Sequence, residues 1–156
     1  MRLTFWIAFF VFLVDQASKY YVVHWLNLAE IRQINVLHPY FNLRMAWNEG
    51  INFGLLSFLG DNGRWVLIAV ALIISGLVAW WVWRDGQGTI VRIAAGLLIG
   101  GAIGNVVDRL IYGAVADFIN MSCCGLRNPY AFNLADIAIF VGAFGLVLFA
   151  GREKRA

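Results

Sequence analysis

Residues 89–112 of the chain read TIVRIAAGLLIGGAIGNVVDRLIY, an apolar run that ends in the polar pattern Asn-x-x-Asp-Arg. A helix of about 20 mostly apolar residues is long enough to cross the hydrocarbon core of a bilayer. Three other stretches of the sequence have a similar length and composition. The four predicted membrane spans comprise residues 4–25, 64–83, 89–112 and 131–151. The sequence therefore predicts an all-α membrane protein of four transmembrane helices, folded as a single domain over residues 1–156.

The composition supports a membrane location. Of the residues, 62% are hydrophobic and 13% are charged, whereas soluble domains have about 45–50% apolar and about 25% charged residues. A soluble fold of this length cannot bury so much apolar surface. Two prolines and two cysteines exclude the disordered, collagen-like and disulfide-scaffold classes. The net charge of +3 is too small to indicate a nucleic-acid partner.

The basic residues indicate how the spans are oriented. The first span lacks an A-x-A-like cleavage site and carries Asp15 and Lys19 where a signal peptide would end, so we expect an uncleaved helix. Lys and Arg are enriched in cytoplasmic segments. They are denser at the termini and beside the short loop 84–88 than in the longer loops. Both termini are therefore predicted to be cytoplasmic.

The longest loop, residues 26–63, is predicted to lie outside the membrane. Residues 43–47 show a strand-like alternation of side chains. The apolar residues 51–59 predict a segment that lies on the membrane surface. We therefore expect this loop to be periplasmic and to contain a small β-platform.

Polar residues inside membrane spans are costly, so they indicate a functional site. With the predicted orientation, they all fall near the outer membrane surface, at the outer ends of the first, third and fourth spans or just beyond. These residues are Asp15, Lys19, Asn105, Asp108, Arg109, Asp117, Asn133 and Asp136. The inner halves of the spans carry no comparable group. One outward-facing site is therefore predicted rather than a path through the membrane.

The carboxylates differ in whether a basic residue lies close by in the sequence. Asp15 and Lys19 are four residues apart and can pair along one helix face. Asp117 and Asp136 have no cation close by in the sequence. Two such carboxylates at one depth can form a dyad that shares a proton, because neighbouring like charges cannot both ionise. One carboxylate then takes a proton from water while its protonated partner polarises a scissile carbonyl.

Five motifs occur in order along the chain. They are Asp15-Gln16-x-x-Lys19, Asn48-x-Gly50-x-x-Phe53-Gly54, Gly100-Gly101-Ala102-x-Gly104-Asn105-x-x-Asp108-Arg109, Gly113-x-Val115-x-Asp117-Phe118 and Phe132-Asn133-x-Ala135-Asp136. Together they resemble the motifs of the bacterial lipoprotein signal peptidases, also called signal peptidase II. The resemblance covers nearly the whole chain, and a joint match of five motifs is highly specific.

The resemblance implies an inner-membrane aspartic endopeptidase whose active site lies near the periplasmic face. Its partners would be membrane lipids and diacylglyceryl-modified prolipoproteins, which it would cut just before the lipobox cysteine. Matched residue by residue, Asp117 and Asp136 are the catalytic pair. The matching support positions are Asp15, Lys19, Asn48, Gly101, Asn105, Arg109, Asn133 and Ala135. We expect no metal, no cofactor and a monomer.

Several of these residues have a structural interpretation beside the functional one. Asp15 and Lys19 can be a structural ion pair only. Arg109 can extend its charged end to the membrane–water interface, or it can bind the substrate backbone or lipid headgroups. Asn105 and Asn133 can hydrogen-bond the dyad or a substrate, or join helices.

The small residues and the cysteines are the remaining candidates for a structural or functional role. Gly96, Gly100 and Gly104 recur every four residues, a pattern that lets helices pack closely. Gly101 can also make room for substrate. The adjacent Cys123 and Cys124 are too few for a structural zinc site, and we interpret them neither as metal ligands nor as nucleophiles.

Two other functions remain open from the residues alone. The outer acids could form the cation site of a small transporter, although a transporter also needs polar groups in the inner half of its spans. The glycine face could belong to a non-catalytic assembly subunit, although such a subunit has no need of two unpaired acids.

Overall fold

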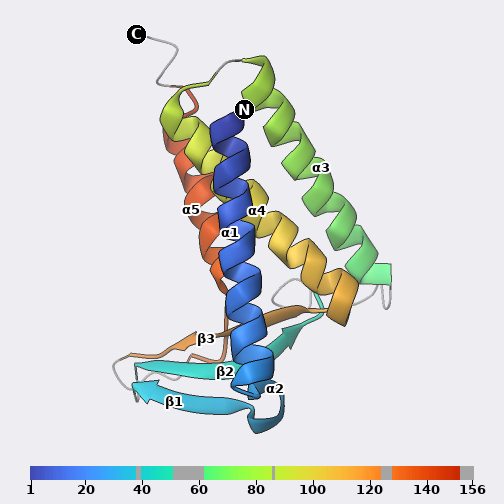
Figure 1. The fold of residues 1–156 in the computed structure, drawn as a ribbon, viewed down its shortest axis with the longest axis vertical. Coiled ribbons are helices and arrows are strands. Elements are labelled where there is room, and N and C mark those ends of the chain that lie inside the picture. The colour runs from blue at the N-terminus through green and yellow to red at the C-terminus, as the bar shows by residue number, and fades with distance from the viewer. Residues whose placement is uncertain (38–39, 51–61, 86, 124–127, 152–156) are drawn as a thin grey trace.

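The computed structural model describes residues 1–37, 40–50, 62–85, 87–123 and 128–151. It is mostly helical, with a three-stranded sheet at one end of the helices (Figure 1). The helices are α1 (Arg2–Tyr20), which continues as the π-helical turn η1 (Tyr21–Trp25), α2 (Leu28–Ile31), α3 (Gly63–Arg84), α4 (Thr89–Tyr112) and α5 (Leu134–Phe149). The strands are β1 (Gln33–Leu37), β2 (Phe41–Asn48) and β3 (Val115–Met121).

Among the described residues, three helical segments are long and apolar enough to cross a membrane. They are Arg2–Trp25, Gly63–Arg84 and Thr89–Tyr112, close to the first three predicted spans. The fourth prediction, 131–151, is met only in part, because α5 is apolar but has 16 residues. Such a helix is about 24 Å long, less than the hydrocarbon thickness of about 30 Å. Its start is fixed by Asn133, whose side chain caps the helix.

Helix α4 is central, because it packs against α1, α3 and α5. Its glycines let α1 approach closely. A Cβ atom on Gly100 would lie 2.5 Å from the carbonyl oxygen of Ala8, and one on Gly96 would lie 2.7 Å from Ile7 Cβ. The predicted small-residue face is therefore confirmed as the contact between α4 and α1. The N-terminus, the start of α4 and the end of α5 lie at the end of the molecule opposite the sheet (Figure 1).

The sheet is built from two separate connections. β2 lies between β1 and β3 and is antiparallel to both. It contains the predicted strand 43–47, which is confirmed. β3 comes from the connection between α4 and α5, so the all-α expectation is corrected to a mostly helical fold with a small sheet. Its first four residues are all buried, so this strand lacks the alternation that marks a half-buried strand. The predicted surface segment 51–59 lies outside the described residues.

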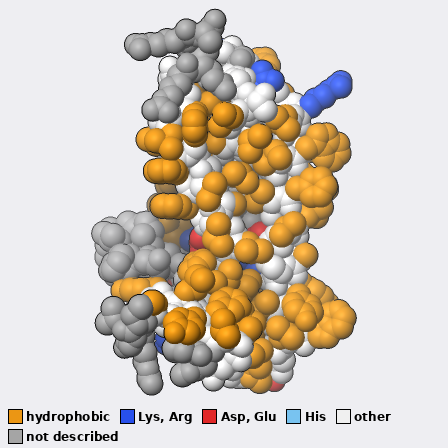
Figure 2. Space-filling view, turned by 90° about the vertical axis from the view of Figure 1, so that its left-hand side faces the viewer, with side chains coloured by type: hydrophobic (Ala, Val, Ile, Leu, Met, Phe, Trp, Pro, Cys, Tyr) orange, Lys and Arg blue, Asp and Glu red, His pale blue; other side chains and the backbone are white. Residues whose placement is uncertain are grey.

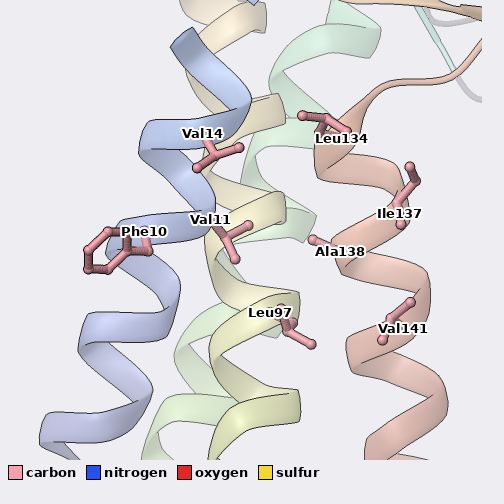
Figure 3. Close-up of a pocket in the computed structure, with 8 residues that line it drawn as sticks. All are labelled: Phe10, Val11, Val14, Leu97, Leu134, Ile137, Ala138 and Val141. Atoms are coloured by element: carbon pink, nitrogen blue, oxygen red, sulfur yellow. The ribbon is translucent and has the colours of Figure 1, made fainter. Parts of the chain in front are cut away.

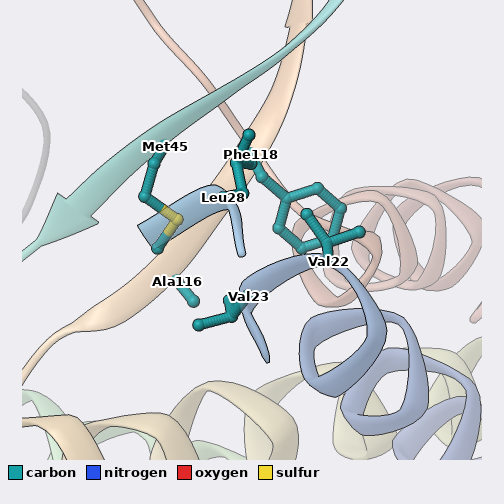
Figure 4. Close-up of a cluster of buried hydrophobic side chains, with 6 residues drawn as sticks. All are labelled: Val22, Val23, Leu28, Met45, Ala116 and Phe118. Carbon is teal, nitrogen blue, oxygen red and sulfur yellow. The ribbon is translucent and has the colours of Figure 1, made fainter. Parts of the chain in front are cut away.

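A buried hydrophobic cluster docks the sheet onto the end of α1 (Figure 4). Its members come from η1, α2, β2 and β3. They are Val22, Val23, Leu28, Met45, Ala116 and Phe118. Ala116 and Phe118 flank Asp117, so burial of these two side chains holds the strand that carries a predicted catalytic carboxylate.

Hydrophobic side chains cover much of the face of the molecule that Figure 2 shows. Phe10 of α1 is 62% exposed, and Phe144 and Val147 of α5 are 58% and 81% exposed. Soluble monomers rarely expose an apolar patch of more than a few hundred Å². The exposed apolar side chains therefore fit a protein whose helices are surrounded by lipid.

Candidate active site

The two predicted catalytic carboxylates lie on different kinds of element. Asp117 lies in β3, opposite Ala46 of β2, and is 3% exposed. Asp136 lies in the first turn of α5 and is half-buried. A bridge between Ile119 and Phe132 joins β3 to the segment that leads into α5. This bridge holds the two carboxylate-bearing segments side by side.

Each carboxylate oxygen of the pair accepts a hydrogen bond. Asp117 Oδ1 accepts from Asn133 Nδ2 at 2.7 Å, and Asp117 Oδ2 accepts from Asn48 Nδ2 at 3.1 Å. Asp136 Oδ1 accepts from Asn105 Nδ2 at 2.9 Å, and Asp136 Oδ2 accepts from the backbone N–H of Asn133 at 3.2 Å. Both carboxylates are therefore held in fixed orientations by amide groups.

The donor amides are themselves fixed. Asn133 is the N-cap of α5, and its Oδ1 accepts from the backbone N–H of Asp136 at 2.9 Å. Asn105 Oδ1 lies 3.2 Å from Lys19 Nζ and 3.3 Å from Asn133 Nδ2, so its Nδ2 faces Asp136. Asn48 Oδ1 accepts from the backbone N–H of Gly50 at 3.2 Å, so its Nδ2 faces Asp117. The carboxylates thus meet donors that cannot turn freely.

The surroundings of Asp117 favour its protonated form. Burial, and next the nearby charge of Asp136, raise the pKa of Asp117 from 3.8 to about 7. The hydrogen bonds from Asn48 and Asn133 act in the opposite direction, because they favour the ionised carboxylate. Near neutral pH Asp117 can therefore carry a proton.

Arg109 lies on the same face of α4 as Asn105. Its Nη1 donates to the backbone oxygen of Asn105 at 3.3 Å. Its positive charge acts on Asp136 and Asp117. Within the described part of the chain, its buried Nε has no hydrogen-bond partner. Arg109 is thus close enough to the dyad for its charge to act on both carboxylates.

The predicted pair of Asp15 and Lys19 forms and gains a third member. Lys19 Nζ lies 2.7 Å from Asp15 Oδ2 and 2.8 Å from Asp108 Oδ2. All three side chains are buried. Asp108 was expected among the outer polar residues but was matched to no catalytic or support position, although an acid in a span without a cation on its own helix face needs one from another helix. That requirement is the signal in the sequence that could have assigned it.

Gly101 and Ala135 form a close contact between α4 and α5. A Cβ atom on Gly101 would collide with the backbone oxygen of Ala135. The backbone N–H of Ala135 donates to Asp15 Oδ1 at 2.9 Å. Both residues therefore lie behind the dyad, where they set the position of the first turn of α5.

An apolar groove of about 350 Å³ lies between α1 and α5 (Figure 3). It is lined by Phe10, Val11, Val14, Leu97, Leu134, Ile137, Ala138 and Val141. Leu134 and Val14 lie at the end nearest the sheet. Because Leu134 is two residues from Asp136, the groove ends close to the dyad.

In the portion of the chain that the structure describes, no group of three or more His, Cys, Asp or Glu side chains could hold a metal ion. The Cys123 sulfur belongs to a disulfide, and Cys124 lies outside the described residues.

The family model described as signal peptidase (SPase) II matches residues 7–151. The chain belongs to the signal peptidase II family. Relatives named lipoprotein signal peptidase include one from Pseudoalteromonas atlantica, 40% identical over 150 residues, which cover 96% of this chain and 89% of the relative. Another, from Beijerinckia indica, is 38% identical over 149 residues, which cover 96% of this chain and 87% of the relative.

Solved structures agree with this assignment. Two structures described as bacterial membrane enzymes share the fold, with TM-scores of 0.80 and 0.78 at 26% and 27% sequence identity. The first match covers 97% of this chain and 94% of that structure, and the second covers 95% and 87%. As a member of the signal peptidase II family, the chain is a transmembrane protease, so the transporter and assembly-subunit alternatives are set aside.

Proposed function

We propose that this protein removes the signal peptides of diacylglyceryl-modified prolipoproteins, cleaving just before the lipobox cysteine. The family and the names of the relatives support this substrate class. The proposed catalytic type is that of an aspartic endopeptidase. The observation that carries it is the pairing of Asp117 and Asp136, whose four carboxylate oxygens are each held by an amide donor.

In the proposed reaction the pair acts with one proton. Asp136 is the carboxylate that takes a proton from water, because the N-terminal end of α5 favours a negative charge there. Asp117 is the protonated partner, because its pKa is raised to about 7. When two neighbouring carboxylates have different environments, the one whose surroundings favour the protonated form can act as the acid and the other as the base.

The protons balance over one turnover. Water adds to the scissile carbonyl carbon, its proton passes to Asp136, and the proton of Asp117 passes to the carbonyl oxygen. The resulting diol then collapses as Asp136 donates its proton to the leaving nitrogen, and a diol hydroxyl returns a proton to Asp117. The products are the signal peptide with a new carboxyl group and the acylated cysteine with a free amine.

The support residues have distinct proposed roles. Asn48, Asn105 and Asn133 orient the carboxylates, while Gly101 and Ala135 set the start of α5. Arg109 is placed to bind backbone oxygens of the substrate, since its guanidinium retains a donor that the described residues leave unused.

The proposed setting is the bacterial inner membrane. Here α5 is the fourth span, both termini are cytoplasmic, and the sheet and dyad lie near the periplasmic face. The groove between α1 and α5 offers an apolar surface that reaches Leu134, two residues before Asp136. The proposed active form is a single-domain monomer, with no metal or cofactor.

The direct test is cleavage of a purified diacylated prolipoprotein by the purified protein, followed by gel shift. Wild type should release the signal peptide, and Asp136→Asn should not. The same prolipoprotein with an unmodified cysteine should be cut far more slowly, in detergent as well as in bilayers. Two acyl chains anchor a peptide stably and so orient its scissile bond at the dyad. Equal rates for both substrates in detergent would contradict the proposed recognition of lipid.

A further inference from the structure

Three buried charged side chains lie behind the dyad and form a cluster that we call the Lys19 cluster, made of Asp15, Lys19 and Asp108. Their exposed fractions are 0%, 3% and 1%. One ammonium group lies within 2.8 Å of both carboxylates. The cluster joins α1 to α4 and contacts neither carboxylate of the dyad in any hydrogen bond of the described residues.

Each of the two carboxylates also accepts a hydrogen bond from a backbone amide. Asp15 Oδ1 accepts from the backbone N–H of Ala135 at 2.9 Å. Asp108 Oδ2 accepts from the backbone N–H of Ala116 at 3.1 Å. Ala135 directly precedes Asp136, and Ala116 directly precedes Asp117. Each member of the dyad is therefore preceded by a peptide N–H that is bound to a carboxylate of the Lys19 cluster.

Neutralising Lys19 does not by itself account for Asp108. The buried ammonium already pairs with Asp15 four residues away, and a further buried carboxylate costs free energy unless it is well hydrogen-bonded. Asp108 meets that condition, because its Oδ1 accepts from Gln16 Nε2 at 3.0 Å and its Oδ2 binds Lys19 and Ala116. The contact with Ala116 is the one that reaches the sheet.

The geometry points to Asp108 as a positioning residue for Asp117, which acts together with Asp15 and Asp136 through the shared Lys19. The Lys19 cluster ties the start of β3 and the start of α5 to one fixed point on α1. The hydrogen bonds of the Lys19 cluster thus help to set the distance between the two dyad carboxylates. The side-chain amides that contact the carboxylates orient them in addition. The consequence for catalysis rests on the proposed function, whereas the positioning itself does not.

Hydrogen exchange at single amides tests the positioning without any substrate. In the full-length protein in detergent, Asp108→Leu should speed exchange of the Ala116 amide at least tenfold and leave Ala135 nearly unchanged. Asp15→Leu should have the converse effect. Asp108→Asn retains an acceptor oxygen and should change Ala116 less than Asp108→Leu does. Ser75→Ala, at a buried α3 hydroxyl without a hydrogen-bond partner among the described residues, is the control and should change neither amide.

Steady-state kinetics on a diacylated prolipoprotein then test the consequence. Asp108→Leu should lower kcat about 100-fold with KM within about twofold, because a misplacement of about 1 Å can cost about 10²-fold in rate. Asp108→Asn should lose about tenfold and remain folded, which keeps the test valid if Asp108→Leu does not fold. The Asp15→Asn, Asp108→Asn double variant should lose less than the product of the two single losses, because the two carboxylates share Lys19.

The outcomes separate the two proposals. Unchanged exchange at Ala116 in a folded Asp108→Leu or Asp108→Asn variant overturns the positioning role. A kcat loss that disappears after correction for the folded fraction also overturns it, since the role is then only structural. If wild type does not cleave the prolipoprotein, the proposed function fails, and the exchange data still decide whether Asp108 positions β3.

Discussion

Asp117 and Asp136 are the same kind of group held in two different ways. Asp117 lies on a strand that is fixed by the hydrophobic cluster of Figure 4, and it is nearly fully buried. Asp136 is half-buried and belongs to the capping box of α5. Burial opposes a charge, whereas a helix N-terminus favours one. The comparison teaches that burial on a strand and a place at a helix N-terminus give two identical side chains different surroundings, and the proposed acid and base roles follow from that difference.

The largest expected effect comes from replacing either carboxylate. Asp117→Asn and Asp136→Asn should each lower turnover by several orders of magnitude, because the volume is kept and the proton chemistry is lost. Expression and helicity should stay near wild type. Turnover on a diacylated prolipoprotein is the measurement. A variant that keeps more than a tenth of wild-type turnover would remove that residue from the proposed dyad.

The Asn133 side chain contacts both Asp117 and the backbone of Asp136. Replacing Asn133 should therefore lower kcat more than replacing Asn48 does. Asn133→Ala removes one donor to Asp117 and the side-chain cap of α5, and kcat should fall about 100-fold or more. Asn48→Ala removes one donor to Asp117 and should cost about tenfold. Parallel kinetics and thermal unfolding in detergent measure both. Equal losses for the two variants would contradict the bridging role of Asn133.

The pH dependence of kcat should report the proton on Asp117. Since the pKa of Asp117 is about 7 and the proposed mechanism needs its protonated form, kcat should fall as pH rises through about 7. Asn48 favours the ionised form, so Asn48→Ala should raise this pKa and move the alkaline limb to higher pH. Profiles from about pH 5 to about pH 9 suffice. A kcat that instead rises as pH rises through about 7 would reverse the assignment of acid and base.

The free energy of unfolding should also depend on the protonation of Asp117, with a smaller effect than on kcat. Because Asp117 has a raised pKa when folded, the folded protein binds its proton more tightly than the unfolded chain between about pH 4 and about pH 7. Its contribution to stability is therefore present at low pH and is lost as pH rises through about 7. Asp117→Asn should remove this part of the slope, as followed by thermal unfolding in detergent. An unchanged slope would place its origin elsewhere.

The smallest effect is expected from replacing the cysteines and from adding a chelator. The Cys123→Ala, Cys124→Ala double variant should keep turnover within about twofold of wild type, and chelators should leave wild type active. Neither treatment touches a carboxylate or its amide donors. Strong inhibition by a chelator that added zinc reverses would instead require a metal mechanism.

The sequence predicted the helices better than the sheet, and the reasons are physical. A membrane span is a long local pattern, so the first three spans were predicted to within a few residues. β3 is short and buried on both faces, so neither alternation nor length distinguishes it. α5 is shorter than predicted, because apolar composition alone does not reveal that Asn133 starts the helix.

For the site, motifs predicted which residues gather but not how they are connected. The structure brings Asn48, Asn105 and Asn133 onto the two carboxylates. The contact between Lys19 and Asp108 joins residues far apart in the chain, and no local spacing rule reaches that distance. The catalytic roles themselves remain predictions, which the variants above test.

The end of the apolar groove beside Leu134 has a consequence for how the reactants arrive. Hydrolysis consumes a water molecule at a site that has apolar side chains on one side and amide donors on the other. Leu134 belongs to the apolar side, and Asp136, two residues later, belongs to the polar side. In the proposed reaction, water therefore reaches the scissile bond from the direction of the sheet, while the acylated substrate approaches sideways from the membrane. The proposed function thus gives the two reactants separate routes, so they do not compete for one entrance.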